Sequence, residues 1–241
     1  MIVCVGLATR DTIYGVPAFP DPDGRVVATE RVVAGGGPAA TAAVAIAKLG
    51  VPVRFVGVVD GELEGVDVVR MPGRMVESTI LVGDGTRAIV TEAPERFTCP
   101  RDALADADWV HVDHVGYGAV ARGDFALSID GGNPIPGLDV ADVDLYAPNR
   151  DDGLRAKLTV VTRGADGCTA YSGGEVIDVP GEPVDGVVST LGAGDVFHGA
   201  LLAAFARGLA LRDALTAANR CAALSCRALD GRSAIPAWEE L

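Results

Sequence analysis

The spacing of apolar and polar positions predicts an α/β domain. Five short apolar runs are bounded by polar residues or glycine, a pattern typical of strands that are buried on both faces of a parallel sheet. These runs are residues 1–7, 53–58, 109–112, 126–129 and 158–162. In three other stretches, small and aliphatic residues recur at intervals of three and four, which predicts helices. They are residues 38–49, 195–207 and 211–228.

Two further segments differ from this alternation. Residues 12–34 and 75–92 are rich in Val, Ile and Thr, with turn signals at 20–24 and 83–85. This composition with that punctuation predicts two antiparallel hairpins. On the pattern alone they are ordinary hairpins at a sheet edge.

Some connections are short for a parallel sheet. Segments 116–125 and 150–157 are barely long enough to cross over between neighbouring parallel strands. We therefore expect several sheet-covering helices to be abbreviated. Either a partner subunit covers the exposed sheet face, or the fold is less stable than a full-length one.

Composition narrows the function classes. The formal net charge of -13 over 241 residues argues against a nucleic acid or an anionic membrane as partner. Five scattered cysteines without C-x-x-C spacing indicate buried thiols in a reducing cytosol. Residues 1–7 lack the basic region of a signal peptide, and no apolar run approaches the length of a membrane span. These features predict a cytoplasmic protein.

Residues 189–200 combine an anion cradle with a base. Gly192 and Gly194 allow a sharp turn into a helix, so that the amides of Gly192, Ala193 and Gly194 can point at one oxyanion. Asp195 in the first helical turn can take a proton from an attacking hydroxyl. In isolation, the same pattern also fits a glycine-rich turn whose Asp favours the helix N-terminus.

This segment resembles the C-terminal signature of the PfkB carbohydrate kinases, the ribokinase-like family. Residues 36–50, Gly-Gly-Pro-Ala-Ala-Thr through Leu-Gly, resemble the N-terminal signature, with Thr41 in the usual Asn place. The two signatures look closest to sulfofructose kinase-type members. The resemblance implies a single domain over 1–241 with a three-layer α/β/α, Rossmann-like core, a mostly parallel sheet and a small antiparallel β lid made by about 12–34 and 75–92.

The implied activity is transfer of the γ-phosphate of ATP to a hydroxyl, usually primary, of a sugar or sugar derivative. Asp195 would act as the base, and the resemblance places substrate-binding roles on Asp11, Gly36, Gly37 and Thr41. Three arginines in the lid segments would be able to meet a phosphate or sulfonate on the substrate. They are Arg25, Arg31 and Arg87.

The nucleotide end is assigned by the same resemblance. Asp152 stands at the place of a family Glu that helps to organise Mg²⁺, here through water, and segment 231–236 matches the region that borders the adenine. The residues matching ATP contacts are Asn149, Thr162, Arg163, Gly164 and Asn219. The implied cofactors are ATP and Mg²⁺. Ser189 replaces an Asp tied to a monovalent cation in many members, so cation activation does not carry over.

Other interpretations stay open at this stage. A nucleoside kinase would need aromatic residues to stack a base, and the candidates are Tyr14, Phe19 and Tyr117. A non-catalytic nucleotide or sugar sensor is the alternative outside enzymes. The lid edges also make a homodimer an expectation to test.

A transition-metal site would draw on the histidines. His111, Asp113 and His114 lie on one predicted strand and His198 near the catalytic segment, but alternation sends His111 and His114 to opposite faces. Packing in the core or pocket is the default. A dinucleotide oxidoreductase is favoured even less than a transition-metal site, because residues 6–10 lack the G-x-G-x-x-G motif that should follow the first strand.

Overall fold

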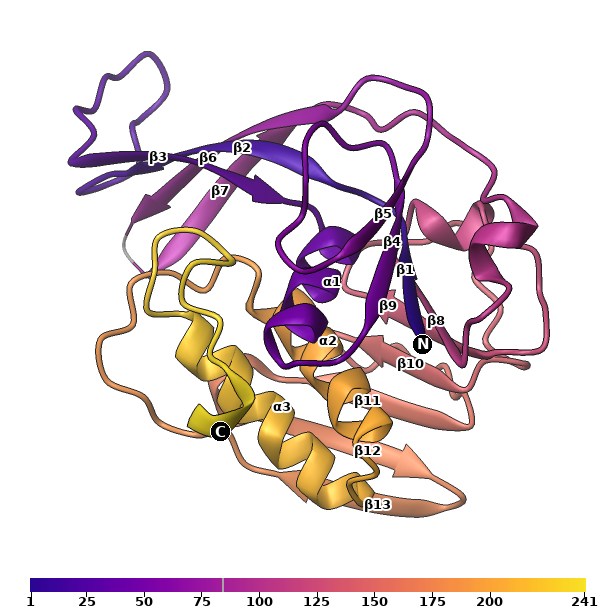
Figure 1. Ribbon diagram of the computed structural model, residues 1–241. Coiled ribbons are helices and arrows are strands. Elements are labelled where there is room, and N and C mark those ends of the chain that lie inside the picture. The colour runs from indigo at the N-terminus through magenta and orange to yellow at the C-terminus, as the bar shows by residue number, and fades with distance from the viewer. Residues whose placement is uncertain (84) are drawn as a thin grey trace.

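A nine-stranded sheet runs through the computed structural model, which describes residues 1–83 and 85–241 (Figure 1). Its order is β13-β12-β11-β10-β9-β8-β1-β4-β5. Neighbouring strands are parallel, except that β12 runs antiparallel to both β11 and β13. The five strands expected from apolar runs are confirmed. The bounds are β1 Ile2–Val5, β4 Val53–Gly57, β5 Asp67–Arg70, β8 Trp109–Val112, β9 Ala126–Gly131, β10 Leu145–Pro148, β11 Leu158–Thr162, β12 Cys168–Ser172 and β13 Glu175–Val179.

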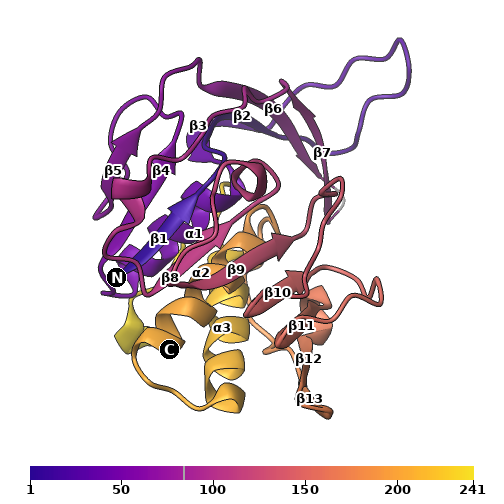
Figure 2. The same ribbon diagram turned by 90° about the vertical axis from the view of Figure 1, so that its right-hand side faces the viewer.

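Three helices cover one face of this sheet (Figure 2). They are α1 (Pro38–Lys48), α2 (Ala193–Ala206) and α3 (Leu211–Ser225), close to the predicted ranges. Small residues let α1 and α2 approach closely, since a Cβ on Gly199 would stand 2.5 Å from the carbonyl oxygen of Ala42. The start of α2, where the candidate base lies, is thereby fixed against α1.

The opposite face of the sheet is covered by irregular chain. Val3 and Val5 of β1 pack there with Val110 and Val112 of β8 against loop residues such as Leu104. The described residues form no α-helix on this face; the 3₁₀ turns η1 (Arg101–Leu104) and η2 (Gly116–Gly118) lie within its covering segments. The outer helical layer of the expected three-layer core is therefore reduced to loops, because the connections are too short, and the chain itself covers the face.

A second, smaller sheet forms the lid. Its order is β3-β2-β6-β7, from β2 (Thr9–Gly15), β3 (Glu30–Gly36), β6 (Val76–Gly83) and β7 (Thr86–Thr91). Both expected hairpins are antiparallel, and a parallel pairing of β2 with β6 joins them. Asp84 of the expected 83–85 turn lies outside the described residues. The two hairpins thus act as one sheet.

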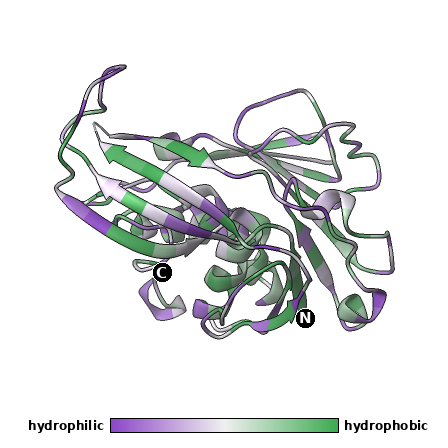
Figure 3. Cartoon of the chain, turned by 90° about the horizontal axis from the view of Figure 1, so that it is seen from above, coloured by the Kyte–Doolittle hydropathy of each residue, from purple (hydrophilic) through white to green (hydrophobic). Residues whose placement is uncertain are grey.

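The lid has an apolar inner face. Apolar and polar positions alternate along its strands (Figure 3), and Ile13, Ile80 and Val82 pack against Leu229 of the C-terminal segment. This alternation gives the lid one apolar face, which it turns toward the body of the protein.

The carboxylate of Asp113 joins three segments just beyond β8. It accepts hydrogen bonds from the backbone N–H groups of Leu7 at 2.8 Å, Ala39 at 3.2 Å, Val115 at 2.8 Å and Gly116 at 2.9 Å. The end of β1, the first turn of α1 and the segment after β8 therefore meet at one buried side chain.

Two further properties of the fold concern its cysteine side chains and the hydropathy of its helices. All five cysteines are free and buried. Within residues 1–83 and 85–241, no helix combines the length and hydropathy required to cross a bilayer.

We predict that Asp113→Asn lowers the free energy of unfolding by about 2 to 4 kcal/mol, because an amide offers one acceptor oxygen and turns an N–H₂ toward backbone donors. Urea denaturation measures the change. Asp124→Asn, at an exposed position, is the matched control and is expected to stay within about 0.5 kcal/mol of the parent. A small loss at Asp113 would show that the junction does not depend on its charge.

Candidate active site

The candidate active site begins at the turn that leads into α2. Gly192 adopts a left-handed backbone with φ of 74°, and the helix begins at Ala193. The N–H of Ala193 donates to the carbonyl of Thr190 at 3.3 Å. Gly192 therefore makes the turn, and a Cβ added at Gly194 would meet no described atom within 4 Å. The first turn of α2, where helix N–H groups lack partners within the helix, faces open space.

Asp195 lies in that first turn and is half-buried. Burial raises the pKa of its carboxyl to about 7, and the nearby charge of Asp130 acts in the same direction, while His198 and Arg232 oppose it. A carboxylate with a pKa near neutrality can accept a proton and release it again, which is what a general base requires.

His198 and Asp130 form a buried pair behind Asp195. His198 follows one turn later on α2, with its Nδ1 3.4 Å from Oδ2 of Asp130 at the end of β9. Burial alone would lower the pKa of His198, but Asp130 outweighs it and raises that pKa. Burial would likewise raise the pKa of Asp130, yet His198 brings it down to about 2. The pair therefore carries both charges.

A second histidine beside the pair is neutral. His111 has its ring centroid 5.7 Å from that of His198, and its Nδ1 lies 3.0 Å from Oγ of Ser128. Burial lowers the pKa of His111 to about 3, and the charge on His198 adds to this. This packing agrees with the core role expected for His111.

The substrate end is built around Asp11 on β2. Its carboxylate is buried, and Oδ1 has no hydrogen-bond partner among the described residues. A Cβ on Gly36 would stand 1.9 Å from Oδ2 of Asp11, so the strand can pass this carboxylate only as glycine. Gly37 then enters α1 with φ of 89°, and a Cβ there would lie 2.5 Å from the carbonyl of Leu7. An unpartnered acceptor here fits a ligand hydroxyl.

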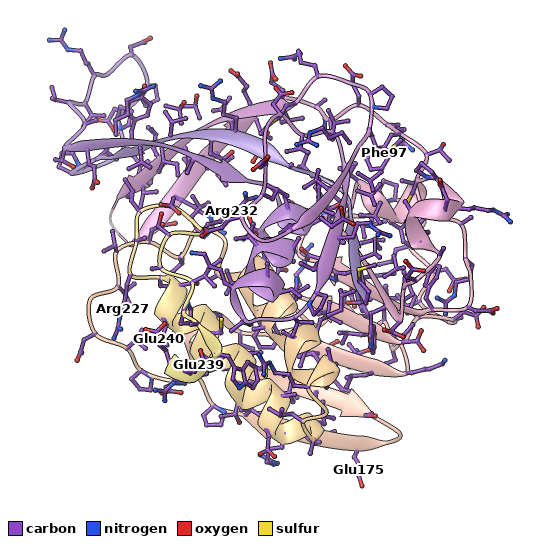
Figure 4. The ribbon with its side chains drawn as sticks, in the orientation of Figure 1. Phe97, Glu175, Arg227, Arg232, Glu239 and Glu240 are labelled. Atoms are coloured by element: carbon purple, nitrogen blue, oxygen red, sulfur yellow. The ribbon has the colours of Figure 1, made fainter. Side chains whose placement is uncertain are left out.

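Thr41 is buried and contacts Arg232, a residue that the sequence motifs did not place beside the residues expected to bind the substrate. The Nε of Arg232 donates to Oγ1 of Thr41 at 3.1 Å, and Nη2 donates to the carbonyl of Gly36 at 2.5 Å. Burial lowers the pKa of Arg232 to about 10, while the charges of Asp11 and Asp195 act against that shift. Figure 4 labels Arg232 beneath the lid and beside α1.

Arg232 belongs to segment 231–236, which was expected to border the adenine. Its side chain contacts Thr41, a residue expected to bind the substrate, because the chain passes Gly192 at Gly231 and then meets Thr41. The two partners are 191 positions apart in the sequence, so local spacing carried no signal for this contact.

Most residues assigned to ATP lie at the carboxyl ends of parallel strands. Asn149 follows β10 and donates to the carbonyl of Gly132 at 3.1 Å, and Thr162 ends β11. Arg163 follows at once and pairs with Asp178 at 3.0 Å. Ligands of open α/β sheets bind at this edge. The full set at the edge is Asn149, Thr162, Arg163 and Gly164.

Asn219 lies elsewhere, on α3. Its side-chain amide donates to the carbonyl of Pro180 at 3.1 Å and to that of Val179 at 3.5 Å. This amide connects α3 to the segment that follows β13.

Asp152 was expected to organise Mg²⁺ through water. Its Oδ2 accepts from the Tyr146 hydroxyl at 2.5 Å and its Oδ1 from the N–H of Leu154 at 3.0 Å. Within the described part of the chain, no group of three or more His, Cys, Asp or Glu could hold a metal ion.

The three lid arginines differ in their contacts. Arg87 donates through Nη1 to Oγ1 of Thr190 at 3.1 Å, so it ties the lid to the turn before α2. Arg25 and Arg31 are exposed. In the same turn, Oγ of Ser189 accepts from the N–H of Leu191 at 3.1 Å.

Comparison with known proteins identifies this arrangement. Residues 135–238 match the model of the pfkB family carbohydrate kinases. A putative ribokinase from Agrobacterium tumefaciens has the same fold with a TM-score of 0.81, 27% identity, and coverage of 99% of this chain and 95% of that one. The chain is thus similar to the pfkB family carbohydrate kinases over residues 135–238, and to a ribokinase fold over nearly its whole length.

Other PfkB relatives differ in how much of the chain they share. An ATP-dependent ribose-1-phosphate kinase from Halopiger xanaduensis is 26% identical over 97% of this chain and 94% of its own length. The probable chloroplastic fructokinase-6 of Arabidopsis thaliana is 41% identical, but over only 34% of this chain and 22% of its own. A ribokinase from Arabidopsis thaliana, complexed with ribose and ATP, shares the fold with a TM-score of 0.78 and 21% identity, covering 99% of this chain and 96% of that one.

Proposed function

We propose that this protein is a PfkB-type carbohydrate kinase, which transfers the γ-phosphate of ATP to a hydroxyl of a sugar or sugar derivative. The observation that carries the proposal is Asp195, a carboxylate whose pKa is raised to about 7 in the open first turn of α2. The unpartnered Oδ1 of Asp11 supports it, since a sugar hydroxyl supplies the missing donor. The similarity of residues 135–238 to the pfkB family carbohydrate kinases and the kinase names of the relatives support it as well.

The residues divide the reaction between them. Asp11 accepts a hydrogen bond from the sugar, and Asp195 takes the proton of the attacking hydroxyl. Amides at the start of α2, at Gly192 and Gly194, stabilise the charge on the transferring phosphoryl group, and the N–H of Ala193 joins them when it releases the carbonyl of Thr190. Mg²⁺ bound to ATP neutralises phosphate charge, and Asp152 would orient a water of that ion. The lid excludes water from the site.

A sugar fits better than a nucleoside. Along β2, Asp11 and Ile13 face the body of the protein, so alternation turns Tyr14 to the other face of the lid. Tyr117 packs on the opposite side of the large sheet, where its hydroxyl accepts from the N–H of Asp139 at 3.1 Å. Neither Tyr14 nor Tyr117 can thus stack a base beside Asp11, which leaves Phe19 as the candidate for a nucleoside kinase. The intact Asp195 favours catalysis over a sensor role.

Phosphorylation of a panel of sugars, sugar phosphates and nucleosides with Mg-ATP tests the proposal. We expect ADP release and a new phosphate ester with at least one sugar or sugar phosphate. Turnover of nucleosides alone would contradict the sugar assignment. Binding of ATP without turnover of any panel member would contradict the kinase assignment.

Asp195→Asn is expected to lower kcat by about 10² to 10⁴ while ATP binding is retained, because the change removes the proton acceptor and keeps the shape of the side chain. Steady-state kinetics and calorimetric titration with ATP measure the two effects. A variant with parental turnover would exclude Asp195 as the base.

The pH profile provides a second prediction. Because Asp195 must be ionised, kcat should fall as the pH drops through about 7. The charge on His198 favours that ionisation, so His198→Asn should move the acid limb upward by about one pH unit. His111→Asn, which removes a neutral ring from the same cluster, is the control and should leave the limb in place. If the acid limb of His198→Asn lies at the same pH as in the parent, the buried pair does not influence the ionisation of Asp195.

We also propose a homodimer that forms through the lid. Every residue of β7 is exposed, including Ile89 at 49% and Val90 at 74%, and the strand is an edge of its sheet. Sedimentation velocity should give a dimer in the parent and a monomer in Val90→Lys. A monomeric parent at micromolar concentration would contradict this proposal.

A further inference from the structure

Arg232 is fixed in place along both its backbone and its side chain. Its N–H donates to Oδ1 of Asp230 at 2.7 Å, and its carbonyl accepts from Nζ of Lys48 at 3.1 Å. The side chain is held by Thr41 and by the carbonyl of Gly36. A hydroxyl oxygen and a carbonyl oxygen thus orient the guanidinium, and neither of them is charged.

The strand beside it leaves room for the guanidinium. A Cβ on Gly35 would stand 2.6 Å from Nη1 of Arg232. Together with Gly36, which clears Asp11, and Gly37, which turns into α1, this position explains a run of three glycines. The run of glycines therefore passes close to the guanidinium of Arg232 at Gly35 and close to the carboxylate of Asp11 at Gly36.

The charge of Arg232 has no ion-pair partner within the described residues. No carboxylate oxygen there lies within 4 Å of its nitrogens, and Nη1 donates to no acceptor. Asp11 and Asp195 are near enough to act on its charge but do not contact it. A guanidinium with spare, fixed donors is a ready ligand for a carboxylate, sulfonate or phosphate.

Arg232 lies at the edge of open space. It lines a cavity of about 790 Å³ together with Gly35 and Lys48, and Asp60, Glu62 and Glu64 also line that cavity, whereas Asp11 and Asp195 do not. On its other side, the preceding Gly231 packs against Gly192, where a Cβ would lie 3.0 Å from the Cα of Gly231. Arg232 thus lies between the substrate end and the turn that leads into α2.

We infer that Arg232 binds a tetrahedral oxyanion in the catalytic site and determines how the enzyme handles charged groups there. The inference rests on the proposed kinase function. The shared chemistry is phosphate-like, and it has two sources: an anionic group carried by the sugar, or the γ-phosphoryl group during transfer. A purely structural clamp between β3 and α1 is the rival explanation.

Arg232→Gln separates these cases when kcat and KM are measured for an accepted sugar and for its monophosphate, with ribose and ribose 1-phosphate as the first pair. If Arg232 binds the anion of the substrate, KM for the phosphorylated sugar rises by about 10- to 100-fold and the neutral sugar is unaffected. If it binds the γ-phosphoryl group, kcat falls by a similar factor on every accepted substrate and KM stays constant.

Arg10→Gln is the matched control, since Arg10 lines the same cavity but is exposed; it should leave both parameters within about twofold. Parental kcat and KM in a folded Arg232→Gln would overturn the inference and favour the clamp. If Arg232→Gln yields no folded protein, Arg232→Lys is measured instead. Lysine keeps the charge but loses the two parallel donors of the guanidinium, so we expect a loss of about 10-fold, either in KM for the phosphorylated sugar or in kcat on every accepted substrate. Parental kinetics in this variant would overturn the inference.

These outcomes are distinct from failure of the proposed function. A parent enzyme that phosphorylates no panel member would fail before Arg232 is tested, whereas an active parent with an unaffected Arg232→Gln would fail only here. The melting temperature of each variant, measured without ligand, shows whether any change in kinetics comes from unfolding.

Discussion

The fold around the active site depends on the four hydrogen bonds that backbone N–H groups donate to Asp113. A buried carboxylate is costly unless its oxygens are satisfied, and here three separate segments satisfy them. Glycine is required on both sides of the junction: a Cβ on Gly6 would lie 2.2 Å from Oδ1 of Asp113, and one on Gly116 would lie 1.9 Å from the carbonyl oxygen of Val5. The exit of β1 toward Asp11 and the start of α1 toward Thr41 are therefore set by one side chain.

The site that follows is a series of alternating charges. Asp130 is paired with His198, His198 lies one turn from Asp195, and Arg232 lies between Asp195 and Asp11. Because each buried charge has an opposite neighbour, Asp195 keeps a pKa of about 7 where burial among carboxylates alone would raise it further. Proton transfer near neutral pH is thus a property of the whole series.

Much of this structure follows from local patterns. Apolar runs located five of the nine strands of the large sheet, namely β1, β4, β8, β9 and β11, and helical spacing located α1, α2 and α3, because burial imposes those periods directly. The turn at Gly192 and the carboxylate of Asp195 are local as well. The Arg232–Thr41 contact and the Asp130–His198 pair join distant segments, so no spacing rule reveals them. Short connections indicated lost helices, but not that loops would cover that face of the sheet.

A crystal structure of Asp195→Asn with Mg-ATP and an accepted sugar tests the central claim most directly. The account predicts that one sugar hydroxyl lies within about 3 Å of the side chain at position 195 and in line with the γ-phosphorus, while another donates to Oδ1 of Asp11. A sugar bound away from both side chains, or a γ-phosphate distant from the first turn of α2, would contradict it.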